Sequence, residues 1–348
     1  MAELSPAPLA LHLDSAALKA NWQWLAQKSG GARCGAAIKA NGYGLGTIEV
    51  LQHLTVAGCR DFFVATWGEA AEVLPHLGNA SLCVLHGVRE EDMAIALASP
   101  ARPVLNSPVQ IARWKAAGGG PCDVMIDTGM NRLGLDPQAL EPVLLEGLQI
   151  ETLMSHLACA DEDHPLNAAQ LASFHALASS VTAQRYSLAN SAGILLGEDY
   201  AFDLTRPGLA LYGGVPRPEA SGHIRQVVRP CAQVLQRRSV RAGESVGYGA
   251  VYVAQAAREV AILNLGYADG YLRSFSSKGA AMLDDLELPV LGRVSMDLIA
   301  VDVSDVPEVQ EGDWLDLLFD LPTAAAQSGL SQYELLTTMG RRYARIWR

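Results

Sequence analysis

The sequence predicts an α/β fold, in which a parallel (β/α)8 barrel at residues 1–230 precedes a smaller, mainly β domain at residues 231–348. Three observations lead to this prediction. The length of 348 residues is greater than that of a typical single domain with one hydrophobic core. Eight short apolar runs alternate with helix-like segments over about 200 residues, somewhat fewer than the ~250 typical of such barrels. After about Pro230 the alternation stops, and short strand-like runs follow one another between turn residues.

The barrel segment begins with a helix that Asp14 or Ser15 can cap and that ends near Lys28. The eight strand-like runs that follow are residues 34–39, 61–66, 81–87, 103–106, 123–127, 150–156, 186–190 and 202–205. The helix-like segments between them include residues 69–77, 92–98, 110–117, 138–146 and 168–181. On pattern alone an open, doubly wound sheet stays possible, because it has the same alternation of strands and helices.

The second domain is expected to consist mostly of strands. They are predicted at residues 233–240, 259–265, 280–283, 289–292, 298–303 and 314–319. Turn residues such as Gly243 and Glu244 separate them. Near the C-terminal end, only residues 332–339 have a helical pattern.

Composition excludes several classes of function. A hydrophobic fraction of 50% with 18% charged residues is typical of a globular protein, and the net charge of −11 argues against a nucleic-acid partner. The six cysteines form no Cys-x-x-Cys pair, so we expect neither a metal site nor a redox dithiol. Residues 1–6 lack the pattern of a signal peptide, and no stretch approaches the ~20 apolar residues of a membrane span. We therefore expect a cytoplasmic protein without a membrane partner.

The most informative stretch is residues 36–46, where an apolar run ends at Lys39 and glycines follow at positions 42, 44 and 46. Such a lysine lies at the carboxyl end of a strand, where barrels keep their chemistry. Small apolar neighbours would lower the pKa of its amine, as covalent binding of a carbonyl cofactor requires. The spacing fits neither a Walker loop nor a dinucleotide-binding turn. The simpler interpretation is a solvated lysine that closes a strand.

Other polar residues also fall at or just beyond the predicted strand ends. They are Arg132, His156, Asn190, Ser191 and Arg206. Because the carboxyl ends of barrel strands meet at one rim, these side chains are expected to converge with Lys39 on a single site.

Residues 38–44 resemble the pyridoxal-phosphate lysine motif of bacterial alanine racemases. The resemblance continues through residues 127–134, 155–156, 189–192, 206–213, 266–270 and 292–297. These blocks occur in the family's order and span nearly the whole chain. The resemblance implies a TIM barrel with a C-terminal β domain, and pyridoxal 5'-phosphate as the cofactor.

The resemblance also implies roles for individual residues. Lys39 would bind the cofactor covalently, Arg206 would face its pyridine nitrogen, and His156 would pack against its ring. The remaining cofactor-binding residues would be Tyr43, Asn190, Ser191, Gly208 and Leu209. An arginine keeps its proton, so Arg206 would leave the pyridine nitrogen unprotonated and favour simple proton return.

Inversion at carbon needs a proton carrier on each face of a planar carbanion. The resemblance implies that Lys39 serves one face and Tyr267 the other, with Tyr267 arriving from the second subunit of a homodimer. Met296 of that subunit and Arg132 would bind the substrate carboxylate. Met125 stands where many relatives have a lysine that orients this arginine. Ser187 stands where some have a histidine behind the pyridine-facing arginine.

The expected activity is the interconversion of L- and D-alanine. Two alternatives stay open: a racemase of broader range acting on serine or larger amino acids, and a non-catalytic pyridoxal-phosphate carrier on the same barrel. The carrier is disfavoured because such proteins resemble the barrel alone, whereas this chain has a second domain with Tyr267 and Met296. The sequence does not tell whether the reaction supplies D-alanine for the cell wall or breaks it down.

Overall fold

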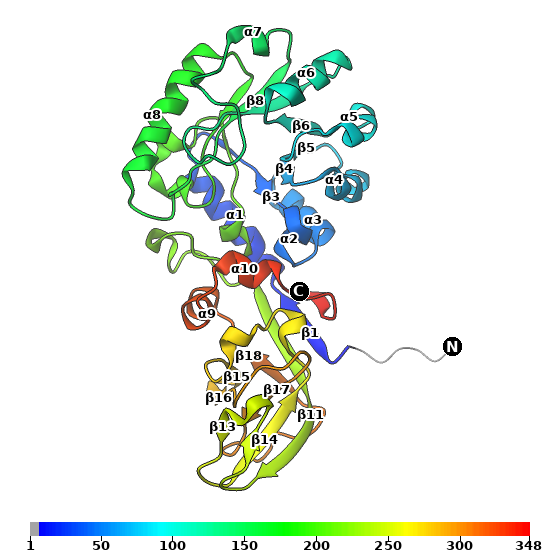
Figure 1. Cartoon of the computed structure of the whole chain (residues 1–348), viewed down its shortest axis with the longest axis vertical. Helices are drawn as coiled ribbons and strands as arrows, with labels where there is room; N and C mark the ends of the chain where they lie inside the picture. Colours follow the sequence, from blue (N-terminus) through cyan, green and yellow to red (C-terminus); the bar gives the residue numbers. More distant parts are fainter. Residues whose placement is uncertain (1–6) are drawn as a thin grey trace, which may run out of the picture. The chain divides into compact units, whose positions relative to one another are not determined.

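A computed structural model describes residues 7–348 of the chain (Figure 1). These residues form two compact units. One unit is Ala17–Arg225, and the other combines the described residues before Ala17 with Gln226–Arg348. Each unit has its own sheet and its own hydrophobic core.

The first unit is built on parallel strands. Seven of them pair in chain order: β3 (Ala36–Ala37), β4 (Asp61–Val64), β5 (Ser81–Val84), β6 (Arg102–Leu105), β7 (Cys122–Met125), β8 (Ile150–Met154) and β9 (Arg185–Ser187). The circle is closed by β10 (Leu204–Thr205), which pairs in parallel with β2 (Arg33–Cys34), just before β3. On its other side β10 meets β9, because the amide of Asp203 donates to the carbonyl of Tyr186 (3.0 Å). Each of the eight predicted runs thus overlaps an observed strand.

Helices surround these strands (Figure 1). They are α1 (Ser15–Lys28), α2 (Lys39–Tyr43), α3 (Thr47–Ala57), α4 (Trp67–Val73), α5 (Met93–Ala98), α6 (Pro108–Ala116), α7 (Pro142–Leu145) and α8 (Pro165–Ser180). Their starts follow local chemistry. At α6, for example, the Ser107 hydroxyl accepts from the amide of Gln110, and Pro108 occupies the first turn.

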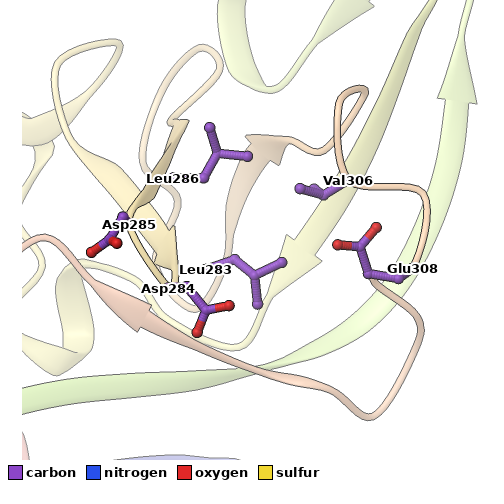
Figure 2. A pocket seen from close by; sticks show the side chains of 6 residues that line it. All are labelled: Leu283, Asp284, Asp285, Leu286, Val306 and Glu308. Atoms are coloured by element: carbon purple, nitrogen blue, oxygen red, sulfur yellow. The ribbon is translucent and has the colours of Figure 1, made fainter.

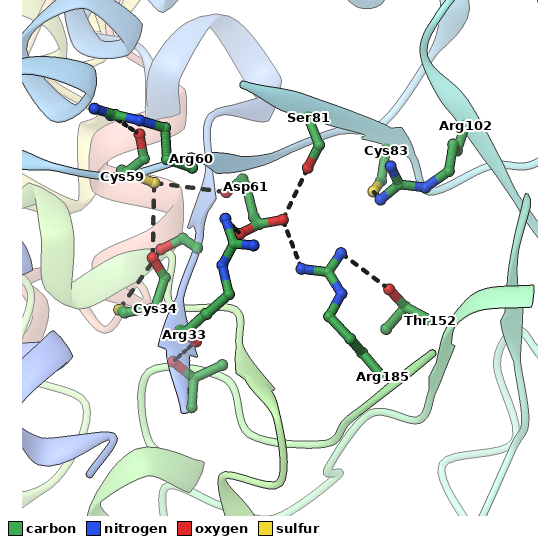
Figure 3. Close-up of polar contacts among 12 residues, drawn as sticks. Arg33, Cys34, Cys59, Arg60, Asp61, Ser81, Cys83, Arg102, Thr152 and Arg185 are labelled. Carbon is green, nitrogen blue, oxygen red and sulfur yellow. Dashed lines mark hydrogen bonds and ion pairs between the residues drawn. The ribbon is translucent and has the colours of Figure 1, made fainter. Parts of the chain in front are cut away.

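Paired charges fill the amino-terminal edge of the barrel (Figure 3). The buried carboxylate of Asp61, at the start of β4, forms ion pairs with Arg33 (3.0 Å) and Arg185 (2.8 Å). Arg102 in β6 pairs in the same way with the buried Asp123 (3.4 Å). Each of these buried carboxylates therefore faces a guanidinium, so neither is left as an unpaired buried charge.

The second unit is a mainly antiparallel sheet. Its strands are β1 (Leu9–Leu13), β11 (Val228–Val240), β14 (Arg258–Leu263), β15 (Ala280–Leu283), β16 (Leu286–Pro289), β17 (Ile299–Asp302), β18 (Trp314–Leu317) and β19 (Ala344–Trp347). The small strands β12 (Ser245–Val246) and β13 (Tyr252–Val253) pair with each other. The long strand β11 pairs with β1, β18 and β14, and its pairing with β14 shifts register between Val234 and Gln236.

The observed units differ from the predicted division at the N-terminal end. The prediction assigned residues 1–230 to the barrel, but β1 pairs with β11 and β19 in the sheet of the second unit. Its buried residues Leu9, Leu11 and Leu13 contribute to that sheet. The alternation along β1 fits a strand in either unit, because the sequence does not say which partner it pairs with.

The expectation of a single helix near the C-terminal end was wrong. Besides α10 (Gln332–Thr337), the structure has α9 (Leu321–Ser328). The Asp320 side chain caps α9 by accepting from the amide of Thr323, and Pro322 lies in its first turn. These are ordinary start signals, which the preceding strand-like run obscured. Across residues 7–348, no helix combines the length and apolar composition that a membrane crossing requires.

Candidate active site

Lys39 lies at the carboxyl end of β3, where the chain enters a left-handed turn. Ala40, Asn41 and Gly42 have φ of 54°, 55° and 58°, and Tyr43 has φ of 53°. The amide of Gly42 donates to the carbonyl of Ile38 (3.0 Å), which closes the turn directly over Lys39. Residues with a Cβ rarely adopt this conformation, so the turn depends on tertiary contacts and not on the glycines alone.

The carboxylate of Glu69 holds this turn in place. One oxygen accepts from the amide of Ala40 (2.7 Å), and the other accepts from the amide of Ala65 (2.6 Å) at the end of β4. Glu69 is also the third residue of the capping box that begins at Thr66. The Thr-x-x-Glu signal could have found the cap, but its bond to the Lys39 turn was missed.

The half-buried amine of Lys39 lies among positive charges. Burial lowers its pKa, the nearby charge of Arg132 lowers it further, and Glu69 opposes both effects. A lysine with a lowered pKa carries more of the neutral amine that can attack a carbonyl carbon. The structure therefore gives Lys39 the environment expected of a covalent cofactor ligand.

Arg132 follows a turn held by Asp127. The Asp127 carboxylate accepts from the amides of Gly129 (2.9 Å), Met130 (2.8 Å) and Arg132 (2.9 Å). Burial alone would raise the pKa of Asp127, but these backbone donors together have the larger effect and lower it. The guanidinium of Arg132 is exposed, and within residues 7–348 no carboxylate forms an ion pair with it. The turn thus presents an unneutralised cation beside Lys39.

His156 lies just beyond β8, and the amide group of Gln170 in α8 fixes its backbone. The Gln170 nitrogen donates to the carbonyl of His156 (2.9 Å), and its oxygen accepts from the amide of Ala158 (2.9 Å). Burial lowers the pKa of His156 to about 3, reinforced by the charges of Arg206, Arg132 and Lys39. The imidazole is therefore neutral near pH 7, as a residue that packs against an aromatic ring should be.

Arg206 is a buried cation whose hydrogen bonds go to neutral oxygens. Its guanidinium donates to the hydroxyl of Ser187 and to the carbonyl of Ser155 (2.5 Å). The same Ser187 hydroxyl donates to the carbonyl of Leu204. Burial lowers the pKa of Arg206 to about 10, while the nearby Cys83 and Asp123 oppose the shift. Arg206 thus stays protonated near neutral pH.

A set of hydroxyl and amide donors lies beside β10. The hydroxyl of Ser191 accepts from the amides of Gly208 (2.9 Å) and Ala210 (3.3 Å). A Cβ added to Gly208 would lie 2.2 Å from the phenol oxygen of Tyr43, which shows how closely that hydroxyl approaches the loop. The ring of Tyr43 stacks on the buried Tyr212, with centroids 4.5 Å apart. Hydroxyl and backbone N–H groups converging on a small space suit a phosphate.

The two other residues of this loop region are placed differently. Leu209 is buried, and its backbone begins the short 3-10 turn Leu209–Tyr212. Asn190 uses its side-chain oxygen to accept from the amide of Gly193 (2.9 Å), which fixes the turn after β9. Met125, at the end of β7, is buried.

Tyr267 and Met296 both lie in the second unit, on two turns that contact each other. The amide of Tyr267 donates to the carbonyl of Ser295 (3.0 Å), and the amide of Ala268 donates to the carbonyl of Met296 (3.0 Å). The guanidinium of Arg273 lies 5.2 Å from the centre of the Tyr267 ring. A cation over the face of an aromatic ring is attracted by the electrons of that face, so Arg273 restrains the position of the Tyr267 ring.

A shallow pocket elsewhere in the second unit contains none of these residues. It is lined by Leu283, Asp284, Asp285, Leu286, Val306 and Glu308 (Figure 2). Its carboxylates have no cation or nucleophile among the lining side chains. Within residues 7–348, no group of three His, Cys, Asp or Glu side chains is arranged to hold a metal ion.

Comparisons with known proteins find relatives along nearly the whole chain. A family model described as "Alanine racemase, N-terminal domain" matches residues 13–216, and one described as "Alanine racemase, C-terminal domain" matches residues 227–347. The alanine racemase of Rhodospirillum rubrum is 43% identical over 96% of this chain and 94% of its own length. That of Cereibacter sphaeroides is 44% identical over 98% of both chains.

A solved structure has the same fold. The alanine racemase of Bartonella henselae, described with covalently bound pyridoxal phosphate, superposes with a TM-score of 0.92 at 36% identity, and the match covers 99% of this chain and 100% of the other. Both domain models and a full-length structural match confirm the resemblance and the predicted fold class. This chain belongs to the alanine racemase family.

Proposed function

We propose that this chain interconverts L- and D-alanine with pyridoxal phosphate, and that Lys39 and Tyr267 move the α-proton on opposite faces of the substrate. The observation that carries the proposal is the set of charged side chains at the carboxyl end of the barrel. There a half-buried amine with a lowered pKa lies near two arginines, Arg132 and Arg206, that no carboxylate within residues 7–348 neutralises. Such a site attracts anions and offers a nucleophilic amine.

The residues present fit pyridoxal phosphate. The hydroxyls of Tyr43 and Ser191 form a neutral donor set suited to the phosphate, and the amide of Gly208 holds the Ser191 hydroxyl beside it by donating to Ser191 Oγ. Arg206 supplies a buried N–H donor for the pyridine nitrogen. Lys39 supplies the amine that binds the aldehyde carbon. When bound, the group supplies an aromatic ring that withdraws electrons from an attached amino acid and makes its α-hydrogen acidic.

The remaining chemistry falls to side chains of this protein. Lys39 Nζ takes the α-proton on one face, and Tyr267 Oη gives a proton to the α-carbon on the other; the reverse reaction exchanges these roles. Arg206 keeps its own proton and leaves the pyridine nitrogen unprotonated. This favours the return of a proton to the α-carbon over other reactions. Arg132 and the amide of Met296 bind the substrate carboxylate and fix the α-carbon between the two proton carriers.

The proposal includes a homodimer in which Tyr267 and Met296 of one protomer complete the site of its partner. In support, Met296 is 54% exposed, and the same unit carries exposed apolar side chains at Tyr248 (67%), Val251 (54%) and Val253 (41%). Three of these residues lie within six positions of the chain, and exposed apolar side chains that form one continuous patch mark an interaction surface. The proposal also includes a cytoplasmic location, consistent with six free cysteines.

One experiment tests the activity and its range. Purified enzyme is assayed for racemisation of L-alanine, L-serine and L-lysine, with and without added cofactor. We expect alanine to be turned over fastest, and Lys39→Ala to lose both turnover and the visible absorbance of the bound cofactor. Equal turnover of serine or lysine would favour the broader racemase, and full activity of Lys39→Ala would refute the assignment of that residue.

A second experiment tests the shared site. Lys39→Ala and Tyr267→Phe are each expected to have very low activity. When the two variants are mixed and exchange subunits, each hybrid dimer contains one site with both wild-type residues, so activity should rise to about one quarter of wild type for random pairing. If both residues come from the same protomer, mixing restores nothing.

A further inference from the structure

The turns that carry Tyr267 and Met296 are in direct backbone contact. Two backbone hydrogen bonds join them, from the amides of Tyr267 and Ala268. In addition, Gly266 leaves no room for a side chain, because a Cβ there would lie 2.2 Å from the carbonyl oxygen of Met296. The phenol of Tyr267 and the amide of Met296 are therefore placed by two turns that must keep one fixed spacing.

One guanidinium bridges these two turns. Arg342 donates from Nε and Nη2 to the two oxygens of Asp269, each at 2.6 Å, and from Nη1 to Asp297 at 2.6 Å. Asp269 lies two residues after Tyr267 and is fully buried, whereas Asp297 directly follows Met296. The Asp269 carboxylate also accepts from the amide of Gly266 (3.1 Å). When both oxygens of a carboxylate accept from one planar guanidinium, the relative orientation of the two groups is fixed as well as their distance.

The segment that delivers Arg342 is itself fixed against the Tyr267 turn. The amide of Gly340 donates to the carbonyl of Asp269 (3.2 Å). A Cβ at Gly270, which has φ of +91°, would lie 2.5 Å from the carbonyl oxygen of Thr338. This close backbone approach fixes the chain just before Arg342 beside the Tyr267 turn.

We infer that Arg342 is a positioning residue for the reaction: it holds the proton-carrying phenol of Tyr267 at a fixed distance from the substrate-binding amide of Met296. The inference rests on the function proposed above and goes beyond it, since that function assigns no role to Arg342. Without the bridge, the buried carboxylate of Asp269 loses its cation and the Met296 turn loses its link to Asp269. The phenol then no longer meets the α-carbon of a substrate held by Met296.

The readout must separate positioning from general damage. In heavy water, one enantiomer of alanine loses its α-proton to Lys39 and the other to Tyr267. Misplacing Tyr267 should slow inversion while the enantiomer served by Lys39 continues to exchange its α-hydrogen with solvent. Partial unfolding would lower exchange and inversion together, so the ratio of the two rates is the diagnostic quantity.

The test uses the holoenzyme and three variants. We expect Arg342→Met to slow inversion about 10- to 100-fold, the scale of a misplacement near 1 Å, while exchange of the Lys39-served enantiomer changes about 3-fold or less. Arg342→Lys keeps the charge but cannot span both carboxylates, and it should lie between wild type and Arg342→Met. If Arg342→Met does not fold, the same ratio is measured on Arg342→Lys.

Arg237→Met is the matched control. Arg237 lies in the same unit, pairs with Glu259 at 3.0 Å and donates to the carbonyls of Pro307 and Val309. It contacts neither turn, so its ratio of exchange to inversion should equal that of wild type. An unchanged ratio in the Arg342 variants, or the same change in Arg237→Met, would overturn the positioning role. A wild-type enzyme that does not invert alanine would instead overturn the proposed function, and this inference with it.

Discussion

Substitution of Gly208 by alanine would push a methyl group into the phenol of Tyr43. The added Cβ would lie 2.2 Å from the Tyr43 oxygen and 2.9 Å from its ring carbon Cζ, whereas ordinary contacts begin at 3.4 Å. The hydroxyl would therefore have to retreat by about 1 Å. The ring cannot move freely, because it stacks on Tyr212, which is fully buried and donates to the carbonyl of Ala37 (2.8 Å).

Two effects follow from this clash. Overpacking a buried site costs about 1–3 kcal/mol of stability, so Gly208→Ala should lower the free energy of unfolding of the cofactor-free enzyme by that amount. In the proposed site, displacing the Tyr43 hydroxyl also removes one donor to the charged phosphate, worth about 1.5–3 kcal/mol. That loss corresponds to roughly 10- to 100-fold weaker binding of pyridoxal phosphate.

The assay is an equilibrium titration of cofactor-free enzyme with pyridoxal phosphate, together with urea unfolding. Gly31→Ala is the matched control, because nothing lies within 4 Å of a Cβ added there. The double variant Gly208→Ala/Tyr43→Phe adds a second check: if both changes act through the Tyr43 hydroxyl, their effects on cofactor affinity will not add. Wild-type affinity in Gly208→Ala would refute the reasoning, as would additive effects.

Three further predictions concern other residues of the barrel. Ser187→Ala removes a hydroxyl that accepts from the buried Arg206, so the free energy of unfolding should fall by about 1–3 kcal/mol and cofactor binding should weaken in a titration; unchanged values would contradict this. Ala40→Gly relieves a φ of 54°, and urea unfolding should show a gain of up to about 1 kcal/mol after the entropy of glycine is counted; a loss would argue against strain. The pKa of His156 is about 3 in the folded protein and 6.5 in its ordinary environment. Between these pH values the unfolded chain binds a proton that the folded protein does not, so stability decreases as the pH is lowered. His156→Gln should thus lose less stability between pH 7 and pH 4 than wild type, whereas the exposed His76→Gln should behave like wild type.

The sequence predicted elements whose signals are local. Lys39, the strand before it and the turn after it lie within one short stretch, and the eight strand positions follow from short apolar runs. Polar residues at strand ends could be assigned to one rim because parallel strands share a direction. What could not be predicted depends on partners far apart in the chain. β1 alternates like any strand, and only its pairing with β11 places it in the second unit.

The supporting residues of the site were missed for the same reason. Glu69 is 29 residues from the Ala40 amide that it binds, and Arg342 is 73 residues from Asp269. Ser187 was noticed only as a departure from relatives with histidine, and its bond to Arg206 required the closed barrel. The left-handed conformation of Ala40 and Asn41 contradicts local propensity. Such conflicts between local preference and structure are expected where a site is built.

The cations at one end of the barrel are paired with carboxylates, whereas those at the other end are not. This contrast indicates where the chemistry takes place. At the amino-terminal edge, Arg33 and Arg185 share Asp61, and Arg102 has Asp123. At the carboxyl edge, Lys39, Arg132 and Arg206 form no ion pair with any carboxylate of residues 7–348. Cations held apart from carboxylates raise the free energy of the empty site, and an anion that binds there lowers it. The carboxylate of an amino-acid substrate is such an anion, so the substrate brings charge that the fold leaves unbalanced at this edge.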